Sequence, residues 1–313
     1  GKHYPNRTSD TKFAEKTVGS INSANKLLLI EAKEGTIKRK PKPPFTTDTM
    51  LQTANSTLGW SISKTSGVAS SLYHSGHISY SRTDSTRTNK KARESIRNHI
   101  SGKLGKEYLG LGIGESGKKK NNVQDAHEAI RPSEPTIESA GKDVDEKKLY
   151  RLIWSRFAAS QMSDSVRERR SLKFSCDGVK VPITGTASWR THDGWENVFS
   201  WSIGKVQSKP PEVGFTIGES WIIDSKSEMT VDYTKPPRRF TESSIIQEMK
   251  RSEIGRPSTY VSMVKNLEQK KYIEKEGSSL VPTQNGKTLW LDVAPHYNQP
   301  VGELFSAEFT AIM

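Results

Sequence analysis

Cysteine is almost absent from this sequence, and long apolar runs are missing. The 313 residues include a single cysteine, Cys176, which excludes an intrachain disulfide and a zinc site made of several cysteines. We expect Cys176 to be a small core residue. No apolar stretch approaches the roughly 20 residues of a membrane-spanning helix, and no segment has the pattern of a signal peptide. The sequence therefore predicts an intracellular protein without a membrane partner.

Hydrophobic and acidic residues are also scarce. Hydrophobic residues make up 32% of the chain and charged residues 27%, a balance that suits two or three modest domains better than one large core. The 48 Lys and Arg outnumber the 35 Asp and Glu, which leaves a formal net charge of +13 spread along the chain. This charge favours an extended polyanion as partner, and nucleic acid is the first candidate. A ribosomal or membrane-surface protein could be equally basic.

The pattern of apolar residues changes twice along the chain. Residues 1–44 are polar and end in a basic, proline-rich stretch that reads as a linker, and helical periodicity begins near Phe45. From about 171 to 233, β-branched and aromatic runs alternate with turn signals, which predicts an antiparallel β module. After Pro237 the pattern is helical again. In the first helical part we expect three helices. One covers about 63–74 and ends at Gly76, and one covers about 145–162 with Leu149, Ile153 and Phe157 as its apolar stripe. The helix between them has one apolar face, formed by Ala92, Ile96, Ile100 and Leu104.

Two segments of the chain resemble each other at an offset of 195 residues (240 − 45). Each copy reads as a helix, a turn with glycine, a second helix and a strand, which suits a winged helix-turn-helix whose second helix meets DNA. Lys64 lies at the start of the second helix and is a candidate for nucleic-acid binding. Chance similarity between two amphipathic helical pairs is the alternative. The offset pairs Phe45 with Phe240, Thr46 with Thr241, Gln52 with Gln247 and Ile78 with Ile273.

The stretch "HISYSRTDS", residues 77–85, places a tyrosine and an arginine two positions apart. We expect a short strand here, and on a strand Tyr80 and Arg82 share one face. A guanidinium beside a phenol can hold a phosphodiester and neutralise the charge that develops on its oxygens, as a tyrosine nucleophile requires. An ordinary strand with a half-buried tyrosine explains the same residues. The neighbours that could position the pair or the sugar–phosphate chain are Thr83, Asp84 and Ser85.

Two further segments supply candidate phosphate ligands. His127 can donate to a phosphate oxygen or relay a proton near neutral pH, and Arg131 would lie on the same side of a helical turn. In "EIGRPSTY", Ser258 and Thr259 stand at an expected helix N-terminus, whose free N–H groups bind phosphate, and Arg256 adds charge. A hydrogen-bonded structural histidine and plain N-capping are the alternatives.

One acidic cluster resembles a metal site. Asp143, Asp145 and Glu146 lie close together in "DVDEKK". They open an expected helix, where acidic residues cap the backbone and interact favourably with the helix dipole. We therefore assign no metal ligand in this chain.

Six motifs in this order closely resemble those of type IA DNA topoisomerases, most like the bacterial topoisomerase I branch. The resemblance extends from about residue 42 to 313. The motifs are "PFTTDTMLQTANSTLGW", "LYHSGHISYSRTDSTR", "VQDAHEAIRPSEP", "LYRLIWSRFAASQM", "PPRRFTESSIIQEMKRSEIGRPSTYVSMVKNLEQKKYI" and the terminal "FSAEFTAIM".

The resemblance implies roles for individual residues. Tyr80 would cut one DNA strand and keep its 5′ end as a phosphotyrosine, Arg82 would stabilise the transition state, and His127 would help to hold the scissile phosphate. The implied reaction is ATP-independent cleavage, strand passage and religation, with chiefly single-stranded DNA as partner. A monomeric catalytic core in the cytoplasm, associated with the nucleoid, is expected. Arg256, Ser258 and Thr259 would match the strand-binding segment of the family.

The resemblance also implies the architecture, an α+β multidomain fold. A β-rich arch would comprise residues 1–44 and 167–233, and a helical gate bearing the tyrosine would comprise residues 45–166. Residues 234–313 would form the C-terminal part of a helical DNA-binding domain. Both helical parts would be winged-helix (CAP-like) domains, and the arch would let the gate lift so that another strand can pass.

This sequence also departs from the family pattern. Family members carry a Toprim domain in which a glutamate and a D-x-D-x-E cluster bind Mg²⁺, and this sequence contains no such motif. We therefore expect Mg²⁺ in the intact enzyme through a Toprim domain supplied in cis or in trans, and little or no activity from this chain alone. The residues on either side of Tyr80, Ser79 and Ser81, are small and polar. Neither removes a catalytic group.

Two other classes of protein are weaker interpretations. A noncatalytic regulator with two winged helices would leave the β-rich segment and the set Tyr80, Arg82 and His127 unexplained. A tyrosine recombinase fits poorly, because the arginine–histidine set of that family does not occur. The sequence leaves open whether the intact enzyme relaxes, decatenates or supercoils DNA.

Overall fold

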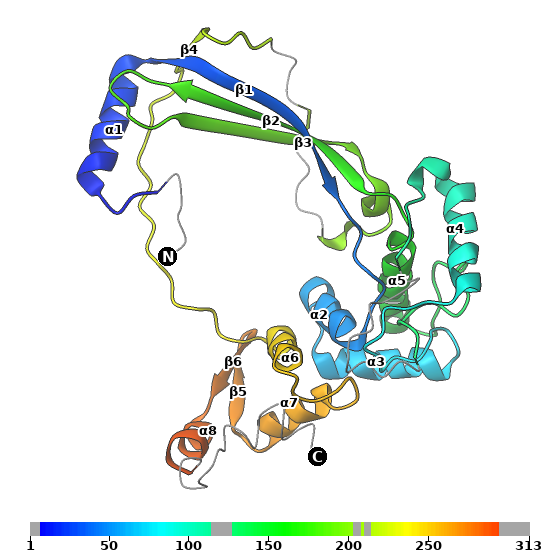
Figure 1. The fold of residues 1–313 in the computed structure, drawn as a ribbon. Helices are drawn as coiled ribbons and strands as arrows, with labels where there is room; N and C mark the ends of the chain where they lie inside the picture. Colours follow the sequence, from blue (N-terminus) through cyan, green and yellow to red (C-terminus); the bar gives the residue numbers. More distant parts are fainter. Residues whose placement is uncertain (1–6, 114–126, 203–207, 210–213, 294–313) are drawn as a thin grey trace. The chain divides into compact units, whose positions relative to one another are not determined.

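The protein is an α+β chain with an antiparallel sheet and a set of helices (Figure 1). The computed structural model describes residues 7–113, 127–202, 208–209 and 214–293. In this part of the chain, no helix is long and apolar enough to cross a membrane. The chain divides into a first unit of Gly1–Arg39, Ser165–Asp193 and Gly204–Pro236, and a second unit of Lys40–Asp164, Gly194–Ile203 and Pro237–Met313.

The first unit is built on a sheet of four antiparallel strands in the order β3-β2-β1-β4. The register between β1 and β2 runs from Leu28 opposite Ser175 to Arg39 opposite Ser165. Cys176 is buried beside this sheet, which confirms it as a small core residue. The elements of this unit are α1 (Thr11–Ala24), β1 (Lys26–Arg39), β2 (Ser165–Ser175), β3 (Ile183–His192) and β4 (Ser220–Ile222).

One expectation for the β-rich part is wrong. Strand β1 ends at Arg39, and the basic, proline-rich residues 40–44 after it form neither a helix nor a strand, in agreement with the linker predicted there. Within residues 171–233, where strands are expected, the segment "GWENVF" begins instead with a short 3-10 helix, Gly194–Asn197. There, the backbone N–H of Trp195 donates to the carbonyl of Ser163 in the second unit.

The second unit contains the remaining helices and a small hairpin of β5 and β6. Helices α4 and α5 begin at side-chain caps: Asn89 accepts from the backbone N–H of Ala92 at the start of α4, and Asp143 from that of Glu146 at the start of α5. The elements are α2 (Thr47–Leu58), α3 (Ile62–His74), α4 (Lys90–Leu104), α5 (Val144–Ala159), α6 (Glu242–Arg251), α7 (Tyr260–Gln269), β5 (Ile273–Glu276), β6 (Ser279–Pro282) and α8 (Gln284–Thr288). Short 3-10 helices cover Lys106–Tyr108 and Ser200–Ser202, and a π-helical turn covers Leu289–Val293.

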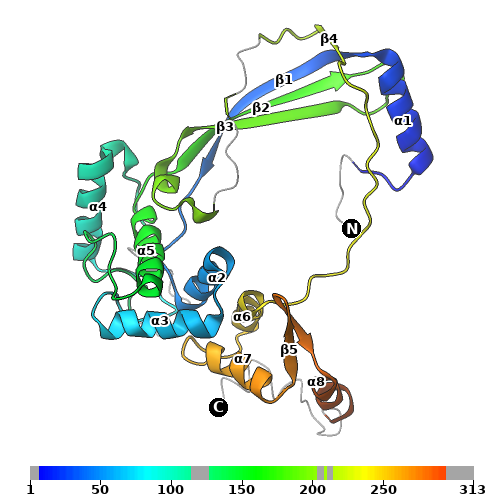
Figure 2. The same cartoon turned by 180° about the vertical axis from the view of Figure 1, so that it is seen from behind.

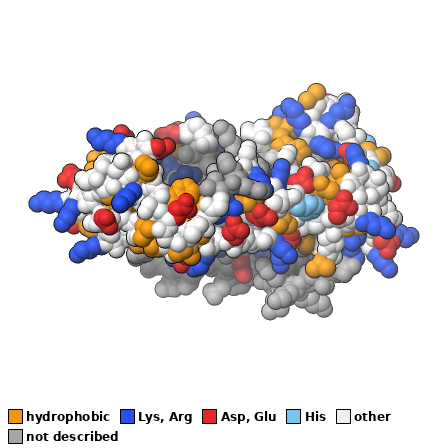
Figure 3. Space-filling view, turned by 90° about the horizontal axis from the view of Figure 1, so that it is seen from above, with side chains coloured by type: hydrophobic (Ala, Val, Ile, Leu, Met, Phe, Trp, Pro, Cys, Tyr) orange, Lys and Arg blue, Asp and Glu red, His pale blue; other side chains and the backbone are white. Residues whose placement is uncertain are grey.

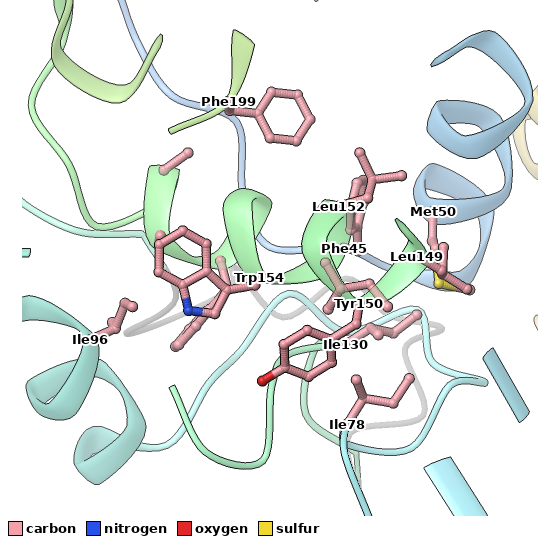
Figure 4. Packing of buried hydrophobic residues seen from close by; sticks show 14 of the residues in the cluster. Phe45, Met50, Ile78, Ile96, Ile130, Leu149, Tyr150, Leu152, Trp154 and Phe199 are labelled. Atoms are coloured by element: carbon pink, nitrogen blue, oxygen red, sulfur yellow. The ribbon is translucent and has the colours of Figure 1, made fainter. Parts of the chain in front are cut away.

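Helix α5 is the centre of the main core. Its expected stripe of Leu149, Ile153 and Phe157 is fully buried, which confirms the prediction. Leu152 and Trp154 are buried as well, so α5 is covered on most of its surface. Figure 4 shows side chains from several other segments packed around this helix, among them Phe45, Ile78, Ile96, Ile130 and Phe199.

The two repeated segments pack against each other through their first helices. Helices α2 and α6 lie side by side in both ribbon views (Figure 1, Figure 2). Gln52 and Gln247, which the repeat pairs, are joined by a hydrogen bond of 2.5 Å between Nε2 of Gln247 and Oε1 of Gln52. Leu51 and Ile246, which stand at the same offset, share one buried cluster. Equivalent positions therefore meet across this interface, as they do in a two-fold symmetric dimer.

Glu138 joins α4 to α5. Its carboxylate accepts from Lys103 Nζ at 2.5 Å and contacts His99 Nε2 at 3.0 Å, both on α4, and it accepts from Arg151 Nη1 on α5 at 2.9 Å. Partial burial acts to raise the pKa of Glu138. The hydrogen bonds from Lys103, His99 and Arg151 outweigh it and lower the pKa from 4.5 to about 2.

We predict that acid weakens this link. A carboxylate with a lowered pKa in the folded state stabilises the fold above its unfolded pKa, and the contribution is lost as the pH falls from about 4.3 to about 2. Glu138→Gln should lower the free energy of unfolding at pH 7 by about 1–2 kcal/mol, after allowance for solvent screening. It should also flatten the pH dependence between about pH 4 and 2, as measured by urea denaturation.

Glu94→Gln on α4 is the matched control, because the partner Lys90 and the Glu94 carboxylate are both exposed. This change should alter the free energy of unfolding by less than about 0.5 kcal/mol. An unchanged acid slope in Glu138→Gln would contradict the prediction.

Candidate active site

Tyr80 lies in a loop, so the expected strand around it is wrong. Only an isolated antiparallel bridge forms here, between Ile78 and Pro132. After Tyr80, the backbone is bonded to the start of α2 and pairs with no strand. The N–H of Thr47 donates to the carbonyl of Thr83 at 2.8 Å. Thr47 Oγ1 also donates to the carbonyl of Ser81 at 2.9 Å and accepts from the N–H of Thr83 at 2.8 Å. A helix terminus therefore takes the hydrogen bonds that a strand partner would take.

The core anchors the segments that carry Tyr80 and His127. Phe45, Ile78 and Ile130 are buried in the cluster around α5 (Figure 4). Ile130 also bridges to Phe45, with its N–H donating to the carbonyl of Phe45 at 2.8 Å. Ile78 lies two residues before Tyr80, and Ile130 three residues after His127. Burial of these apolar side chains therefore fixes where the two polar ones emerge.

Tyr80 and His127 are brought together by this arrangement. Their ring centroids lie 4.9 Å apart with the planes tilted by 46°, and both side chains are half-buried. Arg82 is exposed, and Ser81 between the two is buried. The strand geometry that would place Tyr80 and Arg82 on one face does not exist here, because the residues are not in a strand.

The hydroxyls that follow Arg82 hold the shape of the loop. Thr83 and Ser85 are both buried. Thr83 Oγ1 accepts from the N–H of Ser85 at 3.0 Å, and Ser85 Oγ accepts from the N–H of Arg87 at 3.2 Å. Asp84 between them is half-buried. These contacts fix the backbone next to the candidate nucleophile.

Two of the candidate cations are engaged by protein groups. Arg131 Nε donates to Glu128 at 2.7 Å and Nη1 to the carbonyl of Pro132 at 2.9 Å. Partial burial acts to raise the pKa of Glu128, but hydrogen bonds from Arg131 and Asn89 outweigh it and lower that pKa. The other cation, Lys64, lies 2.7 Å from Asp145 and 4.4 Å from the ring centroid of Trp60.

Three candidate phosphate ligands lie directly before α7, in a turn closed by hydrogen bonds between Arg256 and Thr259. Arg256, Ser258 and Thr259 are all exposed, and α7 begins directly after them. Arg256 Nη1 donates to the carbonyl of Gly255 at 2.9 Å. Gly255 has a φ of +75°, and an added Cβ would lie 2.9 Å from the sulfur of Met263. Glycine is therefore required at this turn.

The phenol of Tyr260 links α7 to the Tyr80 loop. Burial is the main cause that raises the pKa of Tyr260 to about 12, and the charges of Asp48 and Asp84 add to the increase, whereas Arg256 opposes it. Asp48 is buried at the start of α2, where its Oδ1 lies 2.7 Å from Lys250 Nζ of α6. Tyr260 also shares a buried cluster with Leu51 of α2, the helix whose first turn holds the Tyr80 loop.

Sequence reasoning missed Thr47, Asp48, Lys250 and Tyr260. Thr47 and Asp48 stand in "FTTDTM", where they look only like residues at a helix start. Tyr260 follows directly on the candidate segment "RPST", and this position could have marked it as a residue near the candidate site. No local pattern marks Lys250, because its partner Asp48 lies 202 residues away.

The acidic cluster of α5 serves the fold. Asp143 caps the helix by accepting from the N–H of Glu146 at 2.8 Å, and Glu146 accepts from Ser71 Oγ at 2.7 Å. Within the described ranges, no group of three or more His, Cys, Asp or Glu side chains is arranged to hold a metal ion. The side chains in these ranges therefore do not fit a magnesium site.

Comparisons with known proteins give one consistent result. The family described as DNA topoisomerase matches residues 1–313. DNA topoisomerase 1 of Thermotoga maritima is 39% identical over 308 residues, which cover 95% of this chain and 48% of that protein. DNA topoisomerase 1 of Fervidobacterium islandicum is 35% identical over 325 residues, which cover 98% of this chain and 44% of that protein.

A solved structure agrees with these relatives. Full-length topoisomerase I from Thermotoga maritima superposes with a TM-score of 0.79 at 34% identity, over 99% of this chain and 50% of that one. The chain thus spans about half the length of the relatives that it matches.

We predict that the Thr47 hydroxyl stabilises the Tyr80 loop. Thr47→Val keeps the shape of the side chain but leaves the buried N–H of Thr83 and carbonyl of Ser81 without this partner. The free energy of unfolding should fall by about 1–3 kcal/mol, as measured by urea denaturation. Thr47→Ser, which keeps the hydroxyl, should recover much of the loss.

Thr53→Val is the control in the same helix. Thr53 Oγ1 donates only to the carbonyl of Thr49 one turn earlier, and such a bond adds little to a helix. Equal losses for Thr47→Val and Thr53→Val would show that the hydroxyl of Thr47 has no special role.

Proposed function

This chain belongs to the DNA topoisomerase family, and we propose that it is the part of a type IA enzyme that carries the tyrosine nucleophile. The observation that supports this most directly is the contact between Tyr80 and His127 in a loop fixed by the core. Exposed Arg82 lies two residues from the tyrosine. Helix α7, which follows the exposed residues Arg256, Ser258 and Thr259, packs against α2 through Tyr260 and Leu51. In this proposal Tyr80 is the nucleophile, His127 a hydrogen-bond donor, and these exposed residues the phosphate-binding groups.

In the proposed reaction, Tyr80 Oη attacks the phosphorus of a phosphodiester in one DNA strand. The bond between phosphorus and the 3′ oxygen breaks, Tyr80 Oη loses its proton and the 3′ oxygen gains one, so that the products are a free 3′ hydroxyl and a 5′ phosphotyrosine. His127 donates to a non-bridging oxygen, and Arg82 neutralises the charge that develops on the phosphate. Attack by the 3′ hydroxyl on the phosphotyrosine reverses the step and releases Tyr80. No ATP is consumed, because the energy of the phosphodiester is kept in the protein–DNA bond.

The strand is bound by groups around this centre. Arg256 offers charge and Ser258 a hydroxyl to the phosphates, beside the positive end of the α7 dipole. Thr259, whose hydroxyl is bonded to the backbone of Arg256, holds the turn that precedes α7. Asp84 lies within the Tyr80 loop and would position the sugar–phosphate chain. The remaining candidates act through their present contacts: Thr83 and Ser85 shape the loop, and Lys64 and Arg131 add positive charge beside their carboxylate partners.

The wider organisation follows the family pattern in this proposal. Residues 1–44 and 167–233 form the arch, residues 45–166 the gate, and residues 234–313 part of the DNA-binding domain, with winged-helix character in both helical parts. The gate lifts so that a second strand can pass. A Toprim domain with Mg²⁺ completes the site in cis or in trans, and the enzyme acts as a monomeric core on DNA in the cytoplasm.

The charge of the surface supports DNA as the substrate. Lys and Arg side chains are spread over the face shown in Figure 3, interleaved with Asp and Glu, in agreement with the formal net charge of +13. A noncatalytic DNA-binding protein would have the same charge. It would not need a tyrosine ring packed on a histidine beside an exposed arginine.

We predict that Tyr80 forms a covalent bond with DNA. The chain is mixed with a Toprim-containing segment of a relative, Mg²⁺ and a 5′- or 3′-end-labelled single-stranded oligonucleotide, and the adduct is detected by denaturing electrophoresis. Wild-type protein should carry the strand that lies 3′ of the cut, attached through its 5′ phosphate. Tyr80→Phe should form none, because the nucleophilic oxygen is missing.

Tyr150→Phe is the matched control, since the Tyr150 hydroxyl donates to the carbonyl of Ile137 inside the core. It should form the adduct at the wild-type level. An adduct in Tyr80→Phe, or none in the complemented wild type, would refute the assignment of Tyr80.

We predict salt-sensitive DNA binding with little preference for sequence. Arg256→Ala should weaken binding to single strands and reduce the slope of log K against log salt by about 0.7, because one phosphate contact is lost. Arg251→Ala is the control: Arg251 is exposed but pairs with Glu248 on α6, so its loss should leave the slope unchanged. Fluorescence anisotropy at several salt concentrations measures both. Strong preference for one duplex sequence would favour the regulator instead.

A further inference from the structure

The ring of Tyr80 has a second aromatic neighbour, Tyr73. The two ring centroids lie 5.3 Å apart with the planes at 70°, an edge-to-face contact. We propose that Tyr73 is a positioning residue that holds the ring of Tyr80 in the direction of attack. This inference rests on the proposed function of Tyr80 as a nucleophile, and it assigns no chemical step to Tyr73.

Tyr73 is attached to a rigid part of the fold. It lies in the last turn of α3, next to the fully buried Leu72. The helix end is closed by two backbone hydrogen bonds of 2.9 Å, from the N–H of Gly76 to the carbonyl of Tyr73 and from that of His77 to the carbonyl of Leu72. Gly76 has a φ of +73°, which this kind of helix end requires.

Tyr80 has much less local support. Neither Tyr80 nor His127 lies in a helix or a strand. A tyrosine side chain on an irregular backbone can populate several χ1 rotamers, and only one of them can direct the hydroxyl at a bound phosphate. The contact with the helix-borne ring of Tyr73 is therefore suited to select that rotamer before DNA binds.

The contact with Tyr80 explains why an aromatic residue stands at position 73, which packing in the core does not explain. This tyrosine is 38% exposed, so burial alone does not account for an aromatic residue at the end of α3. An edge-to-face pair favours one arrangement over others by about two- to tenfold. This preference comes from the aromatic ring. Phenylalanine should therefore replace Tyr73, and an aliphatic residue should not.

The first test separates positioning from binding. Tyr73→Leu and Tyr73→Phe are made in the chain complemented with a Toprim-containing segment and Mg²⁺, and the single-turnover rate of adduct formation is measured at saturating oligonucleotide. Tyr73→Leu should lower this rate by about two- to tenfold with unchanged affinity for the single strand. Tyr73→Phe should restore the wild-type rate. Loss of affinity with an unchanged rate would instead make Tyr73 a DNA contact and overturn the proposal.

The second test does not depend on activity. The DNA-free chain is labelled with ¹³C in its tyrosine rings, and the Tyr80 signals are assigned from their absence in Tyr80→Phe. In wild type and Tyr73→Phe these signals should be displaced by the neighbouring ring, and in Tyr73→Leu they should move towards the values of a freely rotating tyrosine. Tyr73→Met is measured alongside, so that a ring-free variant is available if Tyr73→Leu does not fold.

The two tests distinguish the two proposals. If the complemented wild type forms no adduct but the Tyr80 signals still depend on the Tyr73 ring, the proposed function fails, and Tyr73 orients the Tyr80 ring without a role in attack. If the adduct forms at the wild-type rate in Tyr73→Leu and its Tyr80 signals are unchanged, the positioning role fails and the proposed function stands. An adduct mapped to Tyr73 in Tyr80→Phe would overturn both.

Discussion

The hydrogen bonds between Thr47 and the backbone of residues 81–83 are the constraint on which the candidate site depends. They bind the chain directly after Tyr80 to the first turn of α2, so the loop does not extend into a strand. Ile78 is buried on the other side of the tyrosine. Tyr80 is thus held between a core anchor and a helix terminus, which leaves its side chain to be oriented by the rings of Tyr73 and His127.

The same turn of α2 also faces the second copy of the repeat. Asp48 follows Thr47 and pairs with Lys250 of α6, and Tyr260 at the start of α7 packs with Leu51 of α2 in one buried cluster. A movement of α6 and α7 relative to α2 would therefore act on the Tyr80 loop through one helix turn. Because the pair is buried on the Asp48 side, separating it would leave a carboxylate with little solvation, which favours a closed arrangement.

Charge alone does not identify the groups that meet a phosphate. Arg131 and Lys64 already have carboxylate partners, whereas Arg82 and Arg256 are exposed. A net charge of +13 attracts DNA to the whole surface. The geometry around Tyr80 is what can select one phosphodiester, since a nucleophile has to be aligned as well as close.

The sequence by itself determined the helices with strong periodicity, because the stripe of α5 and the cap and glycine at the ends of α3 are local signals. It also determined the residue types of the site, since Tyr80, His127 and the α7 N-terminus stand in recognisable motifs. Only the tertiary structure decided how β1 pairs with β2 and that Tyr80 does not lie in a strand. Both outcomes depend on partners far along the chain, β2 for β1 and Thr47 for the Tyr80 loop, and hydrogen bonds between such segments leave no periodic trace in either of them.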